Sequence, residues 1–124
     1  MKAIVTNNAP AAIGPYSQAI EANGFVYVSG QLPINPSTGG FMEGGIKEQT
    51  RQSLLNAKAI LNEAGLDLCN VVKTTVLLSD IADFQAMNEV YAEMFSSPFP
   101  ARSAFAVRAL PKNALVEIEV IASR

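Results

Sequence analysis

The chain of 124 residues contains no histidine, and this absence excludes several kinds of active site. Catalytic pairs of serine or cysteine with histidine cannot form, metal sites ligated by histidine cannot form, and imidazole cannot carry a proton. If the protein is an enzyme, its acid–base chemistry must come from Glu, Asp, Lys, Tyr, Cys or bound water.

Cysteine, clustered positive charge and long apolar runs are also scarce. The one cysteine, Cys69, cannot form an internal disulfide, and with no neighbouring cysteine we interpret it as a small buried hydrophobic residue. The net charge of −2, the pI near 5.0 and the lack of a Lys/Arg cluster argue against binding to a nucleic-acid backbone. No apolar run reaches the roughly 18 residues of a membrane helix, and the start of the chain is too short and too quickly polar for a signal peptide, so we expect a cytoplasmic protein.

The composition that is present is that of a folded globular domain. Hydrophobic residues make up 49% of the chain and charged residues 16%, which is neither a disordered nor a fibrous composition. The length suits one domain with its own core, and we find no internal repeat, low-complexity tract or domain boundary. We therefore predict a single domain over residues 1–124.

Six stretches have the alternating or β-branched pattern of strands, and turn residues separate them. They are Ala3–Thr6, Tyr16–Ala22, Phe25–Ser29, Val71–Leu78, Ser103–Val107 and Leu115–Ala122. Asn23-Gly24 predicts a two-residue hairpin turn between the second and third strands. Gly30 is expected to end the third strand.

Two helices are predicted between these strands. The first covers Ile46–Ala64, where apolar residues recur every three or four positions and Gly65 follows as a stop signal. The second has Asp80 or Asp83 as its cap and is ended by Pro98. The order of the elements predicts an α+β fold, with a mixed sheet of about six strands and two helices on one face.

Arg102 is the first candidate for chemistry, because Pro98 and Pro100 fix the backbone just before it. A guanidinium held rigidly at the edge of a strand is suited to binding a carboxylate through two hydrogen bonds. The alternative is an arginine in a structural ion pair or simply on the surface. The sequence pattern alone favours this alternative.

Glu117 is the second candidate, because a carboxylate in the middle of an apolar strand is costly to bury without a partner. Alternation puts it on the same face as Glu119 and on the opposite face from Val116 and Ile118. One of the two glutamates could lie in a cleft beside Arg102, or both could be ordinary solvated side chains. The register of the final hairpin decides between these readings, since a slip of one residue turns Glu117 to the other face.

Tyr16, Ser29 and Gly30 are weaker candidates on pattern alone. The preceding Gly14-Pro15 fixes the backbone at Tyr16, although a buried tyrosine is usually part of a core. A glycine after a strand lets a ligand approach the backbone, and it is equally a common way to end a strand. Ser29 has no histidine to activate it, which argues against a hydrolase nucleophile.

Taken together, four stretches of the chain resemble the RidA (YjgF) family of enamine/imine deaminases. They are residues 9–18 (APAAIGPYSQ), 29–33 (SGQLP), 100–103 (PARS), and 110–112 (LPK) followed by 116–119 (VEIE). Each stretch is short, but their order and spacing together are specific. The resemblance extends over nearly the whole chain, from about Ala9 to Ala122.

The resemblance implies a fold like that of the trimeric chorismate mutases and a homotrimer with a cleft at each subunit interface. It implies hydrolysis of reactive 2-imino acids, such as 2-iminobutanoate and 2-iminopropanoate, to 2-oxo acids and ammonia. Such imines are released by pyridoxal-phosphate-dependent dehydratases. The chemistry needs no metal and no cofactor, because an imine carbon is already electrophilic.

The resemblance also assigns roles by position. Arg102 matches the arginine that pairs with the substrate carboxylate, and Glu117 matches the glutamate that orients or activates the attacking water. The substrate-binding positions are matched by Tyr16, Ser29, Gly30 and Asn88. Ala104 stands where the family often has cysteine, so any role of that thiol is absent here, although its backbone could line the site.

Two other classes of function stay in consideration. A non-catalytic module that binds a small carboxylate or another protein would need the arginine but not Glu117, so the presence of Glu117 favours catalysis. An RNA-directed activity such as inhibition of translation has been claimed within the family, and the acidic pI and the lack of a basic stripe argue against it.

Overall fold

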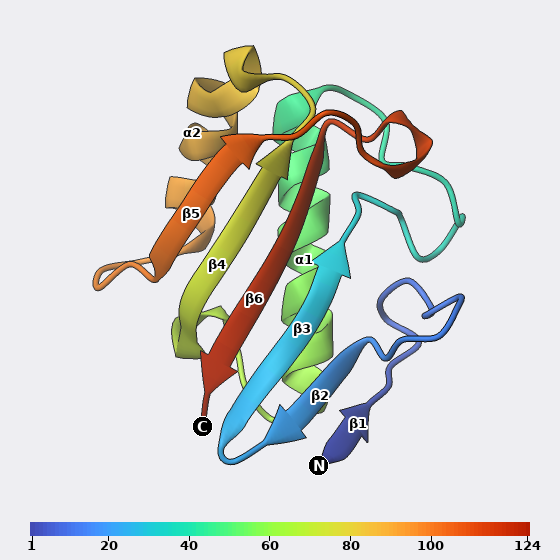
Figure 1. Ribbon diagram of the computed structural model, residues 1–124, viewed down its shortest axis with the longest axis vertical. Helices are drawn as coiled ribbons and strands as arrows, with labels where there is room; N and C mark the ends of the chain where they lie inside the picture. The colour runs from blue at the N-terminus through green and yellow to red at the C-terminus, as the bar shows by residue number, and fades with distance from the viewer.

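The computed structural model describes residues 1–124, which form one six-stranded sheet and two α-helices (Figure 1). The strands are β1 (Lys2–Ile4), β2 (Ala19–Ala22), β3 (Phe25–Gln31), β4 (Val71–Leu78), β5 (Ala101–Ala106) and β6 (Val116–Ser123). The helices are α1 (Ile46–Glu63) and α2 (Phe84–Met94), with short 3₁₀ turns at Leu68–Asn70, Ile81–Asp83 and Pro111–Asn113. The predicted α+β class and the predicted numbers of strands and helices are confirmed.

The strand order in the sheet is β1-β2-β3-β6-β4-β5, and only the β4–β5 pair is parallel. Because β4 lies between β5 and β6 (Figure 1), the final hairpin expected from the sequence is wrong. Apart from Lys73, β4 consists of apolar and β-branched residues, which favour a strand. Its pairing with β6 sets Leu77 opposite Glu117, and this register fixes the face on which Glu117 lies.

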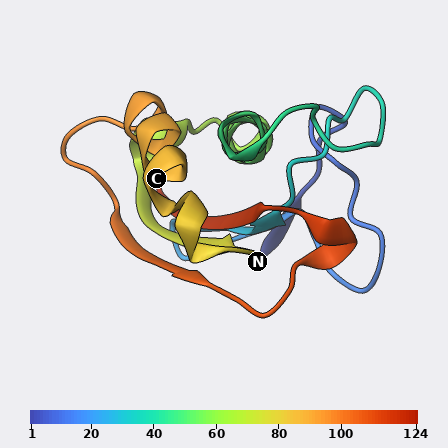
Figure 2. The ribbon, with the colours of Figure 1, turned by 90° about the horizontal axis from the view of Figure 1, so that it is seen from above.

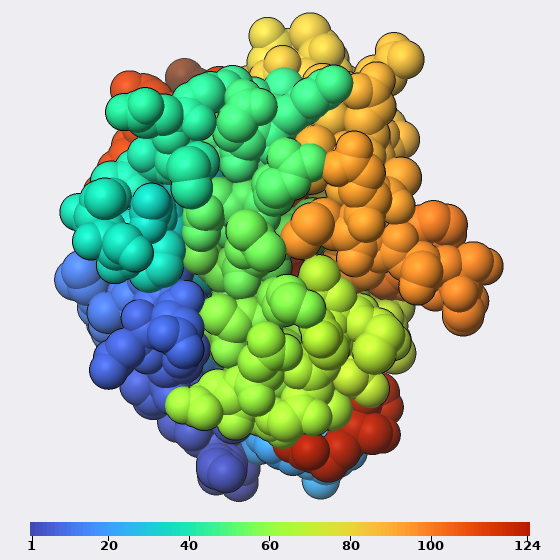
Figure 3. All heavy atoms as spheres, turned by 180° about the vertical axis from the view of Figure 1, so that it is seen from behind, coloured from blue at the N-terminus to red at the C-terminus, as the bar shows by residue number.

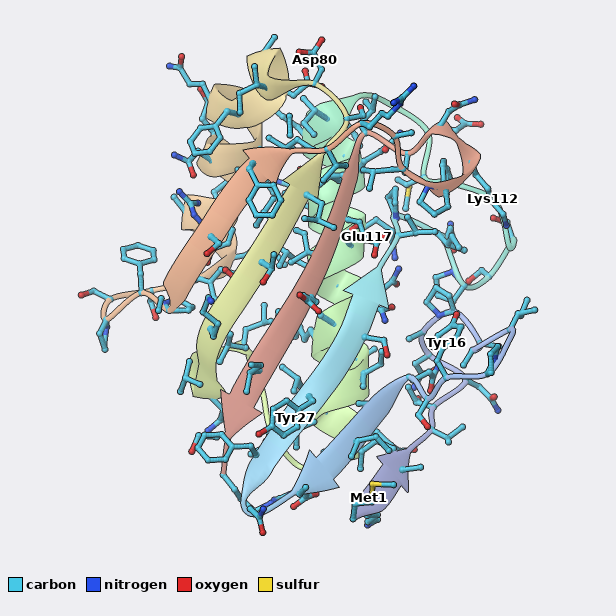
Figure 4. The ribbon with its side chains drawn as sticks, viewed as in Figure 1. Met1, Tyr16, Tyr27, Asp80, Lys112 and Glu117 are labelled. Carbon is cyan, nitrogen blue, oxygen red and sulfur yellow. The ribbon has the colours of Figure 1, made fainter.

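Both helices cover the same face of the sheet, as Figure 2 shows from above and Figure 3 shows from behind. Alternate residues of β6 face these helices and are buried: Val116, Ile118, Val120 and Ala122. The opposite face of the sheet is open and carries the exposed side chain of Tyr27 (Figure 4). The pairing of Phe105 with Leu77 and of Glu119 with Thr75 puts their exposed side chains on the same face. No helix has both the length and the apolar character needed to cross a bilayer.

Helix α1 begins at the predicted residue and ends one residue before the predicted Ala64. The Glu48 carboxylate accepts the Gly45 N–H at 2.8 Å, and Gly65, with φ of 78°, follows the last turn. The predicted apolar stripe is buried against the sheet, but α1 also buries a polar stripe that the sequence reading did not single out. Its members are Gln49, Gln52, Ser53 and Asn56.

Three local predictions are wrong. β2 begins three residues later than predicted, because the Gln18 side chain replaces strand pairing: it accepts the Thr6 N–H at 2.8 Å and donates to the carbonyls of Thr6 and Pro10 at 3.0 and 2.8 Å. Cys69 is exposed instead of buried, since its neighbour Leu68 takes the inward position of that 3₁₀ turn. α2 ends at Met94, well before Pro98.

Candidate active site

Arg102 lies on the edge strand β5 and points toward α2. Its Nη1 donates a hydrogen bond to Asn88 Oδ1 at 2.6 Å. Its guanidinium carbon lies 4.8 Å from the centroid of the Tyr91 ring and 5.5 Å from that of the Phe84 ring. A guanidinium held by one amide oxygen and two aromatic rings has few orientations open to it, so Arg102 is presented rigidly.

No carboxylate of the chain pairs with Arg102. The four ion pairs join Lys47 to Glu89, Arg51 to Glu93, Lys58 to Asp67 and Arg124 to Glu21. Of the alternatives to a ligand-binding role, the structural ion pair is therefore wrong, and Arg102 is partly buried instead of lying simply on the surface. Because its partners are neutral, the guanidinium keeps donors with which a carboxylate ligand could bond.

A cavity of about 400 Å³ opens beside this guanidinium. It is lined by Asn88, Tyr91, Ala92, Phe99, Pro100 and Arg102. Phe99 and Pro100 belong to the segment between α2 and β5, which projects from the body of the molecule (Figures 1 and 3). The proline-rich segment thus forms one wall of the cavity as well as leading into Arg102.

Tyr91 contacts Arg102, and the sequence did not single it out as a candidate for the site. Its hydroxyl shares a 2.7 Å hydrogen bond with the buried Thr74 Oγ1, which fixes the ring under Arg102. Burial raises the pKa of Tyr91, and the bond to Thr74 and the charge of Arg102 offset this only in part. Phe84, Met87, Tyr91 and Met94 recur at helical spacing, and that spacing predicts a helix face packed on the core whether or not one ring also supports a cation.

Glu117 lies on the open face of the sheet, beside a β-bulge in β3 (Figure 4). Between its last two pairings with β6, strand β3 has two residues, Ser29 and Gly30, where β6 has only Glu119. A Cβ on Gly30 would lie 3.0 Å from Glu117 Cδ and would collide with the carboxylate. Gly30 therefore makes room for Glu117, and it lies inside β3 instead of ending the strand as predicted.

Burial raises the pKa of the Glu117 carboxyl above its ordinary value, and the charge of Glu119 raises it further. A carboxyl with a raised pKa can hold or release a proton closer to neutral pH, which suits a general base or acid. No three carboxylate or thiol side chains come together as ligands of a metal would.

Ser29 and Tyr16 lie at the same end of the sheet as Glu117. Ser29 Oγ donates to the Ser17 carbonyl at 2.6 Å, and the Ser29 N–H donates to the Gln18 carbonyl at 3.0 Å. These bonds hold Ser17 and Gln18 against the bulge, and the exposed Tyr16 directly precedes them (Figure 4). The Ser29 hydroxyl is thus used to hold the backbone.

Within one chain, Arg102 and Glu117 do not share a cleft. Arg102 pairs with Thr74 of β4, whereas Glu117 pairs with Leu77 on the other edge of that strand. Three residues along β4 and two strand spacings across it separate the two backbones by roughly 14 Å, and the side chains leave opposite faces of the sheet.

The candidate residues therefore fall into two separate groups, which we call half-sites. The arginine half-site consists of Arg102, Asn88, Tyr91 and Phe84, and the glutamate half-site of Glu117, Gly30, Ser29 and Tyr16. Ala104 lies two residues after Arg102 on the same side of β5, partly buried against the core.

Comparison with known proteins identifies the family. Residues 6–124 match a family model described as Endoribonuclease L-PSP. The human protein named 2-iminobutanoate/2-iminopropanoate deaminase is 51% identical over 121 residues, which are 98% of this chain and 88% of that protein.

Solved structures agree with this match. RidA from the Antarctic bacterium Psychrobacter sp. has a TM-score of 0.96 at 47% identity, with 100% of both chains covered. Escherichia coli TdcF, in a crystal structure with bound serine, has a TM-score of 0.93 at 42% identity, with 100% of this chain and 99% of that chain covered. The chain belongs to the RidA family.

Proposed function

We propose that this protein hydrolyses reactive 2-imino acids, such as 2-iminobutanoate and 2-iminopropanoate, to 2-oxo acids and ammonia. The observation that carries the proposal is Arg102, a partly buried guanidinium aligned by neutral partners and paired with no carboxylate of the chain. The name of the human relative supports the reaction. The bound serine of TdcF, a small amino acid with a carboxylate, supports the class of ligand.

In this mechanism Arg102 binds the substrate carboxylate and Glu117 manages the protons of the attacking water. The substrate enters as the protonated imine. The water oxygen bonds to the imine carbon, the π electrons of the C=N bond move to nitrogen, and a water proton passes to Glu117. Glu117 returns that proton to the amino nitrogen, and the C–N bond breaks as the oxygen lone pair forms the C=O bond. The remaining hydroxyl proton passes to the departing ammonia, so ammonium and the 2-oxo acid are released.

We also propose that each site forms between two protomers of a homotrimer, from the arginine half-site of one and the glutamate half-site of its neighbour. The separation of Arg102 and Glu117 within one chain supports this arrangement. So does the open sheet face, where Phe25, Tyr27 and Phe105 are exposed. A set of large exposed apolar side chains is typical of an interaction surface.

The proposal is tested by generating 2-iminopropanoate in situ and following the release of pyruvate and ammonia. Arg102→Ala should abolish the acceleration while the circular dichroism spectrum and the oligomeric state stay unchanged. Arg51→Ala is the matched control, because Arg51 forms only an exposed ion pair with Glu93, a kind of contact that contributes little. Turnover by Arg102→Ala at the wild-type rate would overturn the proposal. Saturable binding of 2-oxobutanoate by the wild type with no imine turnover would favour the carboxylate-binding module instead.

A further inference from the structure

Helix α1 buries a polar stripe, although covering a sheet requires only apolar side chains. Gln49 and Gln52 are each 7% exposed, and Asn56 is 1% exposed. Burying an amide is unfavourable unless it is hydrogen-bonded, and apolar residues would fill the same space without this cost. The hydrogen bonds of these amides therefore indicate what the stripe does.

Asn56 bonds to the chain that leaves β3. Its Nδ2 donates to the carbonyls of Leu32 and Ile34 at 3.1 and 2.8 Å, and its Oδ1 accepts from Gln52 Nε2 at 2.8 Å. Both donor hydrogens and the acceptor are used, so the orientation of the amide is fixed. Leu32 and Ile34 follow the bulge residue Gly30 by two and four positions.

Gln49 bonds to the chain that enters β6. Its Oε1 accepts the Leu115 N–H at 2.9 Å. Leu115 directly precedes β6 and lies two residues before Glu117. α1 thus contacts the segments that flank both strands of the glutamate half-site, the chain after β3 through Asn56 and the residue before β6 through Gln49.

The bonds from Asn56 and Gln49 lie just beyond the last backbone pairing between β3 and β6. The last pairing between β3 and β6 is Gln31 with Ile118, so Glu117 lies beyond it. On the side of β3, no further strand pairing holds Glu117 against Gly30. Beyond the last strand pairing, the side-chain amides of Gln49 and Asn56 bind the segments at the ends of the two strands from the helix side of the sheet.

We propose that Asn56 and Gln49 are positioning residues for the deamination reaction, which hold the bulge and the start of β6 so that the Glu117 carboxylate stays against Gly30. This inference rests on the proposed function. Loss of either contact lets the two strand ends separate, water reaches the carboxylate, and the carboxyl titrates closer to an ordinary glutamate.

The experiment uses Gln49→Met, which keeps the length of the side chain and loses the acceptor, and Asn56→Leu, which keeps the volume and loses the donors. Gln49→Glu is the conservative control, since its carboxylate can still accept the Leu115 N–H. The Glu117 carboxyl carbon is titrated by NMR in glutamate-labelled protein and assigned by its disappearance in Glu117→Gln. Turnover of 2-iminopropanoate is measured on the same samples.

In Gln49→Met and in Asn56→Leu we expect the Glu117 pKa to fall, with kcat reduced roughly 10- to 100-fold and KM changed less than about twofold. KM is spared because Arg102, which binds the carboxylate, is held by α2. Gln49→Glu should keep kcat within about threefold of the wild type.

A merely structural role would give a different result. If either variant folds with lowered stability but with the wild-type Glu117 titration and kcat, the positioning role is overturned for that residue. The two variants act on separate strands, so failure of one to fold leaves the other as the test. The proposed function fails separately, if the wild type itself shows no turnover while the titration still differs between the wild type and the variants.

Discussion

Glu117 lies where an ionised carboxylate is unfavourable to the fold. Burial and the charge of Glu119 raise its pKa, so the folded state binds the proton more tightly than the unfolded state does. This contribution to stability is fully present below the unfolded pKa of about 4.3 and is lost as the pH rises through the folded pKa. Glutamine has the same shape as glutamate but no charge, so a glutamine at this position does not lose stability as the pH rises.

We therefore expect Glu117→Gln to raise the Tm at pH 7 by roughly 1–4 °C and to leave it unchanged at about pH 3. Turnover should fall roughly 10²- to 10⁴-fold, since the proton acceptor is removed. Thermal unfolding is compared at one protomer concentration, because the stability of an oligomer depends on concentration. A lower Tm at pH 7 would contradict the burial argument, and undiminished turnover would rule out an acid–base role.

Gly30→Ala tests the contact between the bulge and the glutamate. The added Cβ collides with the end of the Glu117 side chain, which is flexible, so the carboxylate moves and the backbone does not. We expect the fold to persist and kcat to fall roughly 10- to 100-fold. Gly40→Ala is the control, because a Cβ there meets only Thr38 Oγ1, at 3.9 Å. Equal activity of the two variants would show that Gly30 does not serve Glu117.

At the scale of residues, the sequence predicted those side chains whose type is unusual for their place. Arg102 after two prolines and Glu117 in an apolar strand are of this kind. Tyr91 and Asn56 could not be found in this way, because their roles depend on partners far along the chain. Tyr91 bonds to Thr74, and Asn56 bonds to carbonyls more than 20 residues before it.

At the scale of elements, α2 is the support of Arg102. Phe84, Asn88 and Tyr91 recur at helical spacing and present two rings and an amide oxygen to one guanidinium. The buried side chains of Met87, Val90 and Tyr91 pack α2 onto the rest of the fold, whereas its exposed ion pairs with α1 contribute little. The position of Arg102 therefore depends on the packing of α2.

The pair of variants Tyr91→Phe and Tyr91→Leu separates two roles of this helix residue. Tyr91→Phe removes the bond to the buried Thr74 hydroxyl, so we expect a loss of about 1–2 kcal/mol in the free energy of unfolding and an unchanged KM. Tyr91→Leu also removes the ring under Arg102, so KM should rise roughly 3- to 10-fold. Chemical denaturation and steady-state kinetics measure the two effects. The same KM in both variants would show that the ring does not support Arg102.

The elements themselves were predicted well where the signal is local. β4 has the predicted bounds, and the turn at Asn23-Gly24 has φ of 53° and 80°, the conformation that these two residues favour. The order of strands was not predicted, because β4 separates β5 from β6 through pairings distant in sequence. Gly30 was misplaced for the same reason, since a bulge is defined only by the partner strand.

At the scale of the molecule, the two half-sites lie on opposite faces of one sheet. Arg102 is covered by α2, and Glu117 is on the face that no helix covers. A substrate with a carboxylate and an imine carbon one bond apart cannot reach both residues in the same chain. Their joint use therefore requires that the open face of one protomer meet the β5 edge of another.

A mixture of two inactive variants tests this requirement. Arg102→Ala lacks the clamp and Glu117→Gln lacks the base, so each is expected to be inactive alone. In a homotrimer with threefold symmetry, random mixing at equal amounts gives an intact Arg102 facing an intact Glu117 at about one interface in four. Co-refolding the two variants should therefore restore roughly a quarter of the wild-type activity, while simple mixing without subunit exchange restores none. Light scattering on the same samples reports the oligomeric state. If co-refolded trimers stay inactive, both residues act within one protomer or do not act together, and the intersubunit site is wrong.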